Sequence, residues 1–164
     1  MKGIFEYQTL STSMGFIVKE YFQPHFTSPF HFHDVYELAF IGKSFGKLYA
    51  GNNVINFSDN DMFLFGPGFP HCFYNDKEFT STGETAHAIV IFFREDFLGK
   101  GFFANRELSH IKGILQNSSY GVKLNKSSNE IKGLLNQLVR KKGMDALILI
   151  LQILNRISKQ HKTV

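Results

Sequence analysis

Residues 29–37 read PFHFHDVYE, and this stretch places His31, His33 and Glu37 at positions of the same parity. Successive side chains of a β-strand point to opposite faces, so an extended chain here would aim these three groups at one side. Imidazoles and carboxylates are ligands that divalent metals accept, and the spacing H-x-H-x3-E offers them together. The stretch therefore predicts a polar cluster on one face of a strand.

A fourth side chain of ligand type, His71, ends the stretch GPGFPH at residues 66–71. The Gly/Pro turn before it is rigid, which fixes the position of the imidazole. We expect the four groups to meet inside the fold, as the wall of a small-molecule pocket and as a candidate site for Zn, Fe, Mn or Ni. The alternative is that the histidines shape the pocket without holding a metal. The candidate pocket and metal residues are His31, His33, Glu37 and His71.

The first hundred residues consist of short apolar segments separated by turn signals, such as Asn52-Asn53 after Gly51. Each segment is rich in β-branched and aromatic residues, as strands are. Many short strands at such spacing are typical of an all-β sandwich or barrel. The predicted strands cover residues 15–22, 36–41, 47–50, 54–57, 62–65 and 87–93.

After Gly101 the apolar residues recur at helical spacing instead. A helix is expected around residues 108–115, a second over 127–142 with Ser127 as its N-cap, and a last one over 144–159. A short strand-like piece separates the first two helices. The chain thus predicts a mainly β domain followed by a C-terminal α-helical pair.

The last predicted helix is apolar around well over half of its circumference. A helix that covers one core needs an apolar arc of only about 100° or somewhat more. The excess predicts a second apolar contact, most simply with another copy of the chain, and the alternative is a helix buried within one domain. The candidate dimer-interface residues are Leu147, Ile148, Leu151, Leu154 and Ile157.

The two histidine stretches resemble the two signature motifs of the cupin superfamily. The sequence departs from the motifs at Ser44 and Asn60, where Gly is usual, and at Gly66, where Pro is usual. The resemblance implies a cupin barrel, which is a double-stranded β-helix or jelly roll, with all four of the family's metal-ligand positions filled. The matching residues are His31, His33 and Glu37 in the first motif, and Gly68, His71 and Asn75 in the second.

A narrower resemblance concerns HDVYEL at residues 33–38, NDMFLF at 60–65 and GFPH at 68–71. These phrases are similar to those of the N-terminal sensory domains of AraC-family transcription regulators. The resemblance implies a barrel that senses a small-molecule effector and a helical pair that dimerises. In that family DNA is bound by a separate C-terminal module with two helix-turn-helix units, and no such module is recognised within these 164 residues.

Composition fits a cytoplasmic protein. The chain has one cysteine, Cys72, which excludes an internal disulfide, and its N-terminal residues lack the apolar run of a signal peptide because Glu6 and Gln8 interrupt it. The longest aliphatic run, residues 147–151, is far too short to cross a bilayer, so no membrane partner is expected. Residues 110–164 carry 10 Lys/Arg against 2 Asp/Glu, which fits either a nucleic-acid contact or, our preferred interpretation, a solvated helix face.

We therefore expect a cupin β-barrel over residues 1–100 and a helical dimerisation segment over 101–164, packed together as one structural domain. The leading hypothesis is the sensing and dimerisation domain of an AraC-type regulator, which is not an enzyme and reaches DNA only through a module outside this chain. The alternative is a stand-alone metal-dependent cupin enzyme of the dioxygenase or isomerase type. A purely structural dimerisation domain is a third hypothesis, disfavoured because unpaired polar groups inside a core are costly.

Overall fold

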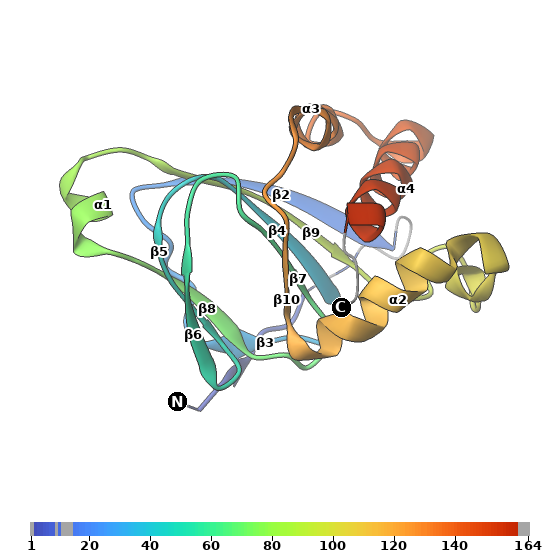
Figure 1. The fold of residues 1–164 in the computed structure, drawn as a ribbon, viewed down its shortest axis with the longest axis horizontal. Coiled ribbons are helices and arrows are strands. Elements are labelled where there is room, and N and C mark those ends of the chain that lie inside the picture. Colours follow the sequence, from blue (N-terminus) through green and yellow to red (C-terminus); the bar gives the residue numbers. More distant parts are fainter. Residues whose placement is uncertain (1, 9, 11–14, 161–164) are drawn as a thin grey trace.

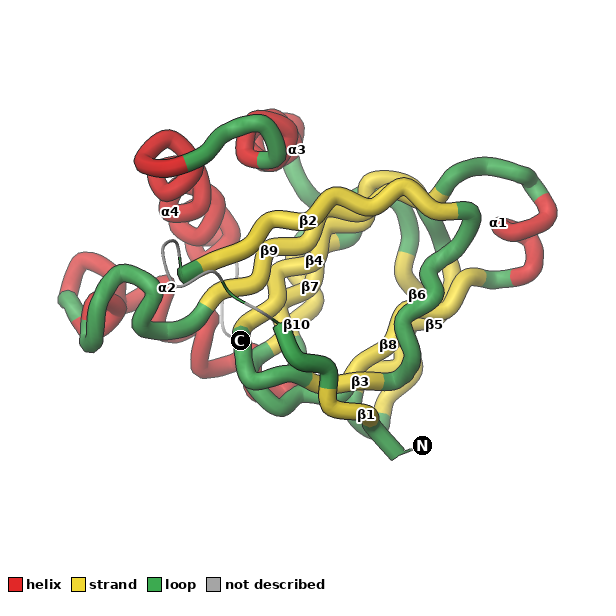
Figure 2. The backbone as a smooth tube through the Cα atoms, turned by 180° about the vertical axis from the view of Figure 1, so that it is seen from behind, coloured by secondary structure: helices red, strands yellow, loops and turns green. Residues whose placement is uncertain are grey.

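The computed structural model describes residues 2–8, 10 and 15–160 of the chain. Within these residues the strands form two five-stranded sheets that face each other as a flattened barrel (Figure 2). One sheet has the order β1-β3-β8-β5-β6, and the other has the order β10-β7-β4-β9-β2. The strands are β1 (Ile4–Phe5), β2 (Phe16–Gln23), β3 (His31–Phe32), β4 (Tyr36–Lys43), β5 (Gly46–Ala50), β6 (Asn53–Phe57), β7 (Met62–Phe65), β8 (His71–Asn75), β9 (Ala86–Phe93) and β10 (Val122–Leu124).

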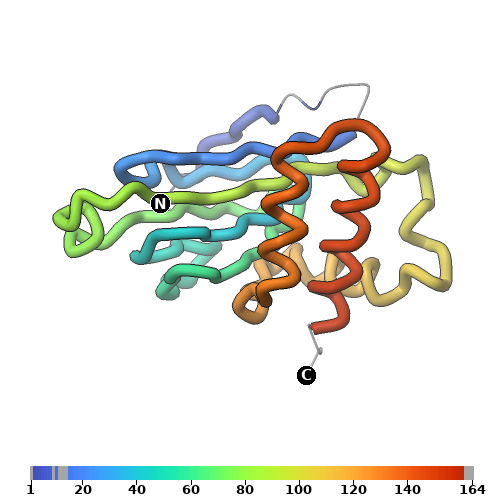
Figure 3. The backbone as a smooth tube through the Cα atoms, turned by 90° about the horizontal axis from the view of Figure 1, so that it is seen from above, coloured from blue at the N-terminus to red at the C-terminus, as the bar shows by residue number. Residues whose placement is uncertain are grey.

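The helices gather on the outer face of the β10-β7-β4-β9-β2 sheet (Figure 1). Seen from above, α3 and α4 run antiparallel to each other across the strands (Figure 3). Only the short α1, between β8 and β9, lies at the far end of the barrel. The helices are α1 (Lys77–Ser81), α2 (Ser109–Asn117), α3 (Asn129–Leu138) and α4 (Gly143–Gln160), and the 3₁₀ turns are η1 (Phe102–Ala104), η2 (Arg106–Leu108) and η3 (Ser118–Tyr120).

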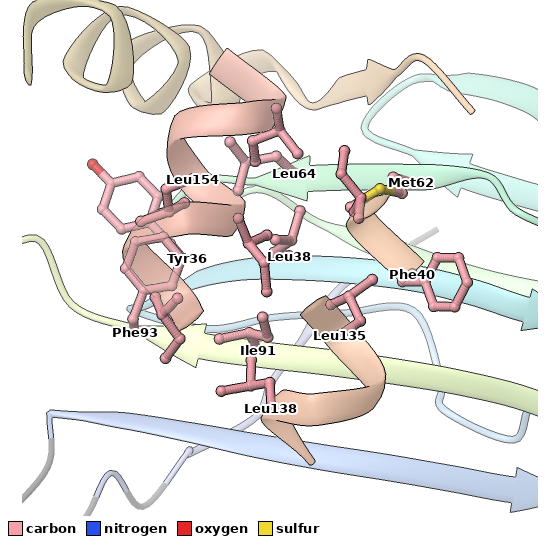
Figure 4. Close-up of a cluster of buried hydrophobic side chains, with 14 of the residues drawn as sticks. Tyr36, Leu38, Phe40, Met62, Leu64, Ile91, Phe93, Leu135, Leu138 and Leu154 are labelled. Atoms are coloured by element: carbon pink, nitrogen blue, oxygen red, sulfur yellow. The ribbon is translucent and has the colours of Figure 1, made fainter. Parts of the chain in front are cut away.

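The sheet that carries the helices is buried on both faces, because its strands alternate between two apolar sets. On β4, Leu38 and Phe40 join the core beneath the helices, whereas Ala39 packs in the barrel interior with Val90 of β9. Figure 4 shows the outer set, in which Leu135 and Leu138 of α3 and Leu154 of α4 lie over Leu38, Leu64 and Ile91. One sheet therefore has the barrel interior on one side and the helices on the other.

Strand β10 connects the two parts of the molecule. It follows α2 in the chain, pairs antiparallel with β7, and leads directly into α3. Lys123 of β10 donates from Nζ to Asp61 Oδ2 at 2.9 Å and to the Asn56 carbonyl at 3.1 Å. The segment after residue 100 thus contributes a strand to the barrel as well as the helices.

The mainly β fold with a C-terminal helical pair is confirmed, and each of the six predicted strands corresponds to a strand of the structure. The prediction of Ser127 as the N-cap is wrong. Ser128 is the N-cap, since its Oγ accepts from the Ile131 backbone N–H at 3.2 Å, while the Ser127 N–H donates to the Asn60 carbonyl of the barrel. Residues 161–164, the end of the predicted helical segment, lie outside the described residues.

Most of the apolar surface of α4 is buried by contacts within the chain, because the helix packs against the sheet and against both α2 and α3. Leu154 and Ile157, which we predicted at a dimer interface, are 1% and 2% exposed and belong to the chain's own core. They are therefore unavailable to a second copy. Leu147 and Leu151 are half-buried, and Ile148 is 43% exposed. No helix in the described part of the chain has both the length and the apolar character needed to span a membrane.

Candidate metal centre and pocket

The four predicted residues come together inside the barrel, although not from one continuous strand. His31 lies in β3 and Glu37 in β4, and the chain between these strands bends at residues 34–35. The prediction of a single extended strand is therefore wrong, because β3 and β4 belong to different sheets. His71 opens β8, where it is the register partner of His31. The side chains converge because the bend carries the chain from one sheet to the other.

The donor atoms of the cluster are close. His33 Nε2 lies 2.8 Å from Glu37 Oε2, and His71 Nε2 lies 3.1 Å from the same oxygen. One ligand atom from each of His31, His33, Glu37 and His71 can be chosen so that all four lie within 4.8 Å of one another, and all four residues are buried. A single divalent cation could be shared by donors at such separations.

All three imidazoles are held by backbone carbonyls through Nδ1. His31 Nδ1 lies 2.8 Å from the Pro29 carbonyl, His33 Nδ1 lies 2.9 Å from the Val35 carbonyl, and His71 Nδ1 lies 3.0 Å from the Phe69 carbonyl. A carbonyl only accepts, so each Nδ1 carries the proton and each neutral ring presents the Nε2 lone pair to the cluster. Metal-ligating histidines are typically oriented in this way.

This arrangement needs a positive charge at its centre. In the neutral rings, the Nε2 lone pairs of His33 and His71 would face the lone pairs of the Glu37 carboxylate, which is repulsive. Protonated rings or a bound cation would each supply the missing charge. The residues present therefore fit a divalent metal, and their donor set suits Zn, Fe, Mn or Ni.

The pKa values of the cluster reflect the same charges. Burial alone would raise the pKa of Glu37, but the neighbouring His71 charge and the hydrogen bonds from His33 and His71 hold this pKa far below its usual range. Burial opposes protonation of His71, yet the Glu37 carboxylate outweighs it and raises the His71 pKa. Burial, and then the charge of His71, lower the pKa of His31. Without a metal, the shifts in pKa favour a positive charge on His71 over one on His31.

The cluster opens into a cavity of about 80 Å³ inside the barrel. His31, Glu37 and His71 contribute polar wall, and Phe26, Phe73 and Phe92 are among its aromatic residues. His33 lies behind them and is completely buried. The cavity can hold a molecule with only a few non-hydrogen atoms beside the cluster, given that a cavity of about 150 Å³ accepts benzene.

Two residues of the second motif serve the structure rather than the cluster. Gly68 adopts a φ of 79°, which favours glycine, and its N–H donates to the His33 carbonyl at 2.8 Å. Asn75 donates from Nδ2 to Ser44 Oγ and accepts at Oδ1 from the Phe26 N–H at 2.7 Å. Ser44, the position where the motif departs from Gly, is therefore the partner of another motif residue.

Sequence reasoning missed several pocket residues, above all Glu6 and Gln8 of the N-terminal segment. Gln8 is buried and accepts at Oε1 from Lys19 Nζ at 3.0 Å. The alternation of polar Glu6 and Gln8 with Phe5 and Tyr7 is the signal in the sequence that points to a strand with a polar face. Tyr21 of β2 also lines the cavity.

Two further histidines have partners of their own outside the cluster. His87 pairs with Glu20 at 2.8 Å and stacks on Phe22, and His110 pairs with Asn155 at 2.9 Å. The thiol of Cys72 donates to the Ser28 carbonyl at 3.1 Å. None of these three side chains lines the cavity.

Comparisons with known proteins agree with the fold. No family model matches the chain, and no curated protein matches it by sequence. A structure of ToxT from Vibrio cholerae matches with a TM-score of 0.56 and 14% identity, over 92% of this chain and 58% of that chain. An unsaturated fatty acid bound structure of wild-type ToxT from the same species matches with a TM-score of 0.54 and 15% identity, over 91% of this chain and 56% of that chain.

A deletion mutant of Bacillus subtilis oxalate decarboxylase matches with a TM-score of 0.40 and 14% identity, over 71% of this chain and 35% of that chain, and we draw nothing from a similarity at that level. This chain spans less than two thirds of each of these proteins, and the similarity to ToxT concerns the fold alone. With the barrel, the helical pair and the histidine cluster in place, the chain has a cupin-type fold that resembles the sensory domains of AraC-family regulators.

Proposed function

We propose that this chain is the small-molecule-sensing and dimerisation domain of an AraC-type transcription regulator. The observation that carries the proposal is the position of the β10-β7-β4-β9-β2 sheet between the cavity and the helices. Glu37 and Phe92 line the cavity on its inner face, and Leu38 and Ile91 contact the core beneath α3 and α4 on its outer face. A ligand in the cavity would therefore contact the same strands that support the helices.

Small-molecule binding is supported by the cavity itself and by the fatty acid bound structure of ToxT, whose fold this chain shares. DNA would be reached only through a module outside this chain. A cytoplasmic location fits these roles and the single cysteine, Cys72. The same proposal assigns dimerisation to the segment over residues 101–164, which packs on the barrel of residues 1–100 and adds β10 to one of its sheets.

We also propose that the cluster of His31, His33, Glu37 and His71 holds a divalent metal. The support is the orientation of the three rings. Each ring donates from Nδ1–H to a backbone carbonyl, so that the Nε2 lone pairs converge. A bound metal would supply a fixed positive charge able to hold an anionic ligand in the cavity. His31, Glu37 and His71 also line the cavity, so they would meet such a ligand directly.

For the dimer, we propose the exposed side of α4. Met144, Ile148 and Leu151 are spaced four and three residues apart, so they lie on one side of the helix together with Leu147. Met144 is 69% exposed, and Leu147 and Leu151 are half-buried. This apolar stripe replaces the wider set predicted from the sequence, since Leu154 and Ile157 are in the core.

The second candidate function is a metal-dependent cupin enzyme. The observation that favours it is that the four-donor cluster opens directly into the cavity, where a substrate could meet the metal. In this case the pocket residues would be the same, and the helical pair would serve assembly only.

One experiment separates the two functions. The chain, purified without an affinity tag, is loaded in turn with Zn, Mn, Fe and Ni, and binding of acetate and of formate, which are small enough for the cavity, is measured by calorimetry. Sedimentation velocity then gives the dimer dissociation constant with and without each probe. A sensory domain predicts that a bound probe changes the dissociation constant and is recovered unchanged. Conversion of a probe, or a dissociation constant that is the same with the pocket filled, would count against the sensory function.

A further inference from the structure

The N-terminal segment runs along the edge of the sheet beside the cluster. Strand β1 pairs in parallel with β3, in the register Ile4 to His31 and Phe5 to Phe32. The Ile4 N–H donates to the Phe30 carbonyl at 3.0 Å, and the Glu6 N–H donates to the Phe32 carbonyl at 2.8 Å. These two bonds flank His31 and fix the backbone of Glu6 next to the cluster.

The alternation of the segment sends its polar residues toward the cavity. Phe5 packs against Phe32, with ring centroids 5.5 Å apart. Side chains alternate along an extended chain, so Glu6 and Gln8 point the other way, and both line the cavity. The carboxylate of Glu6 is therefore a second acid, besides Glu37, that faces the cavity.

Glu6 pairs with one imidazole of the cluster, that of His31, and it lies outside the group of four donors that are all within 4.8 Å of one another. Glu6 Oε2 lies 3.2 Å from His31 Nε2, and the Nδ1–H of His31 donates to the Pro29 carbonyl. A lone pair of the neutral ring thus faces a carboxylate oxygen, which again calls for a positive charge between them. Two ligands bound to one cation at about 2.1 Å each and at roughly a right angle are themselves about 3 Å apart.

We propose that Glu6 is a fifth ligand of the metal, supplied by the N-terminal segment from the cavity side. The inference rests on the proposed metal centre and names a residue that lies outside both histidine motifs. Because Glu6 lines the cavity, its carboxylate would compete with an external ligand that approaches a bound metal from the cavity. An external ligand that replaces it must offer similar chemistry, which means a small carboxylate.

The arrangement allows Glu6 to leave without unfolding the barrel. Its side chain is 47% exposed, whereas that of Glu37 is 6% exposed. Strand β1 consists of two residues at the edge of its sheet and is paired only with β3. Entry of a carboxylate would therefore exchange one oxygen ligand for another, with release of the Glu6 side chain into solvent.

The test uses Co²⁺ as a spectroscopic probe of the full chain and of Glu6→Gln. The control is Glu78→Gln, the same change at an exposed acid of α1. Chelator competition gives the dissociation constant for Co²⁺, the visible absorption reports the coordination number, and acetate titration gives the affinity of the cobalt-loaded protein for a carboxylate. We expect Glu6→Gln to weaken Co²⁺ binding by about tenfold or more, to intensify the visible bands as one ligand is lost, and to bind acetate more tightly than the wild type.

Other outcomes are equally clear. If wild type and Glu6→Gln bind Co²⁺ with the same affinity, spectrum and acetate response, Glu6 is only an ion-pair partner of His31, and the metal centre stands without it. If the wild type does not bind Co²⁺, the metal centre itself is wrong and this inference is wrong with it. Glu6→Asp is the control for a folding defect, since it keeps the negative charge and shortens the side chain by one methylene group. We expect its Co²⁺ affinity to lie between those of wild type and Glu6→Gln.

Discussion

Glu37 and Leu38 are consecutive residues of β4 whose side chains enter two different interiors of the protein. Glu37 meets His33 and His71 at the cavity, and Leu38 packs in the core beneath α3 and α4. The pocket and the helical layer are thus separated by the thickness of one sheet, so substitutions on the two faces should have separable effects.

Leu38→Ala should reduce the free energy of unfolding by about 2–5 kcal/mol, because it leaves a cavity in a core where Leu38 is 1% exposed. Urea denaturation measures this loss. Tyr120→Ala, at a position that is 86% exposed and outside the α4 stripe, is the control and should change the free energy of unfolding by less than about 0.5 kcal/mol. A Leu38→Ala protein that is as stable as the control would contradict the packing described for the sheet.

Metal loading should stabilise the folded chain, since only the folded state brings the four donors together. At a free metal concentration of about a hundred times the dissociation constant, the gain is about 2.7 kcal/mol. Thermal denaturation with Zn²⁺ and with EDTA measures it. His33→Ala should abolish the gain, whereas His110→Ala, whose ring pairs with Asn155 outside the cluster, should retain it. Equal gains in the two variants would place the metal elsewhere.

In the metal-free protein, the Glu37–His71 pair should make the free energy of unfolding depend on pH. The pKa of Glu37 is lowered, so its stabilising contribution is present above its ordinary value of 4.5 and is lost as the pH falls further. The pKa of His71 is raised, so its contribution is complete below its ordinary value of 6.5 and is lost as the pH rises through the raised value.

The difference in unfolding free energy between wild type and Glu37→Gln should therefore be largest between these two pH values and become smaller on both sides. Urea denaturation in EDTA across a pH series measures this difference. A difference that grows steadily toward alkaline pH would show that His71 is not the positive partner of Glu37.

The proposed dimer depends on the stripe along α4. Ile148→Asp should place a charge at the centre of the stripe and shift the chain from dimer to monomer in sedimentation velocity. Val54→Asp introduces the same charge at an apolar position of β6 that is 54% exposed, and this control should remain dimeric. Dimers in both variants would show that α4 does not form the interface.

The sequence was most informative where the local pattern and the fold agree. The six predicted strands have clear apolar or aromatic patterns, and the motif spacing was enough to bring His31, Glu37 and His71 together. The route of the chain between His31 and Glu37 was not predictable in the same way. Same-parity spacing is satisfied by one strand, and equally by two strands of facing sheets joined by a bend.

Strand β1 illustrates a second limit. Strand β1 has only two residues, so it carries no periodicity, and its place is set by pairing with β3 far along the chain. This is why Glu6 was missed. The sequence also could not show which side of α4 is buried within the chain. A helix that packs against a sheet and two other helices has a broad apolar arc whether or not a second copy of the chain binds it.

The path of the chain through β10 has a consequence for any attempt to divide the molecule. Cutting after residue 100 would strip β7 of its neighbour on one side and leave the apolar outer surface of its sheet open to water. A naked strand edge beside such a surface is a template for aggregation. The barrel and its helices should therefore melt in one cooperative transition, and the fragment of residues 1–100 alone should be recovered as an insoluble product.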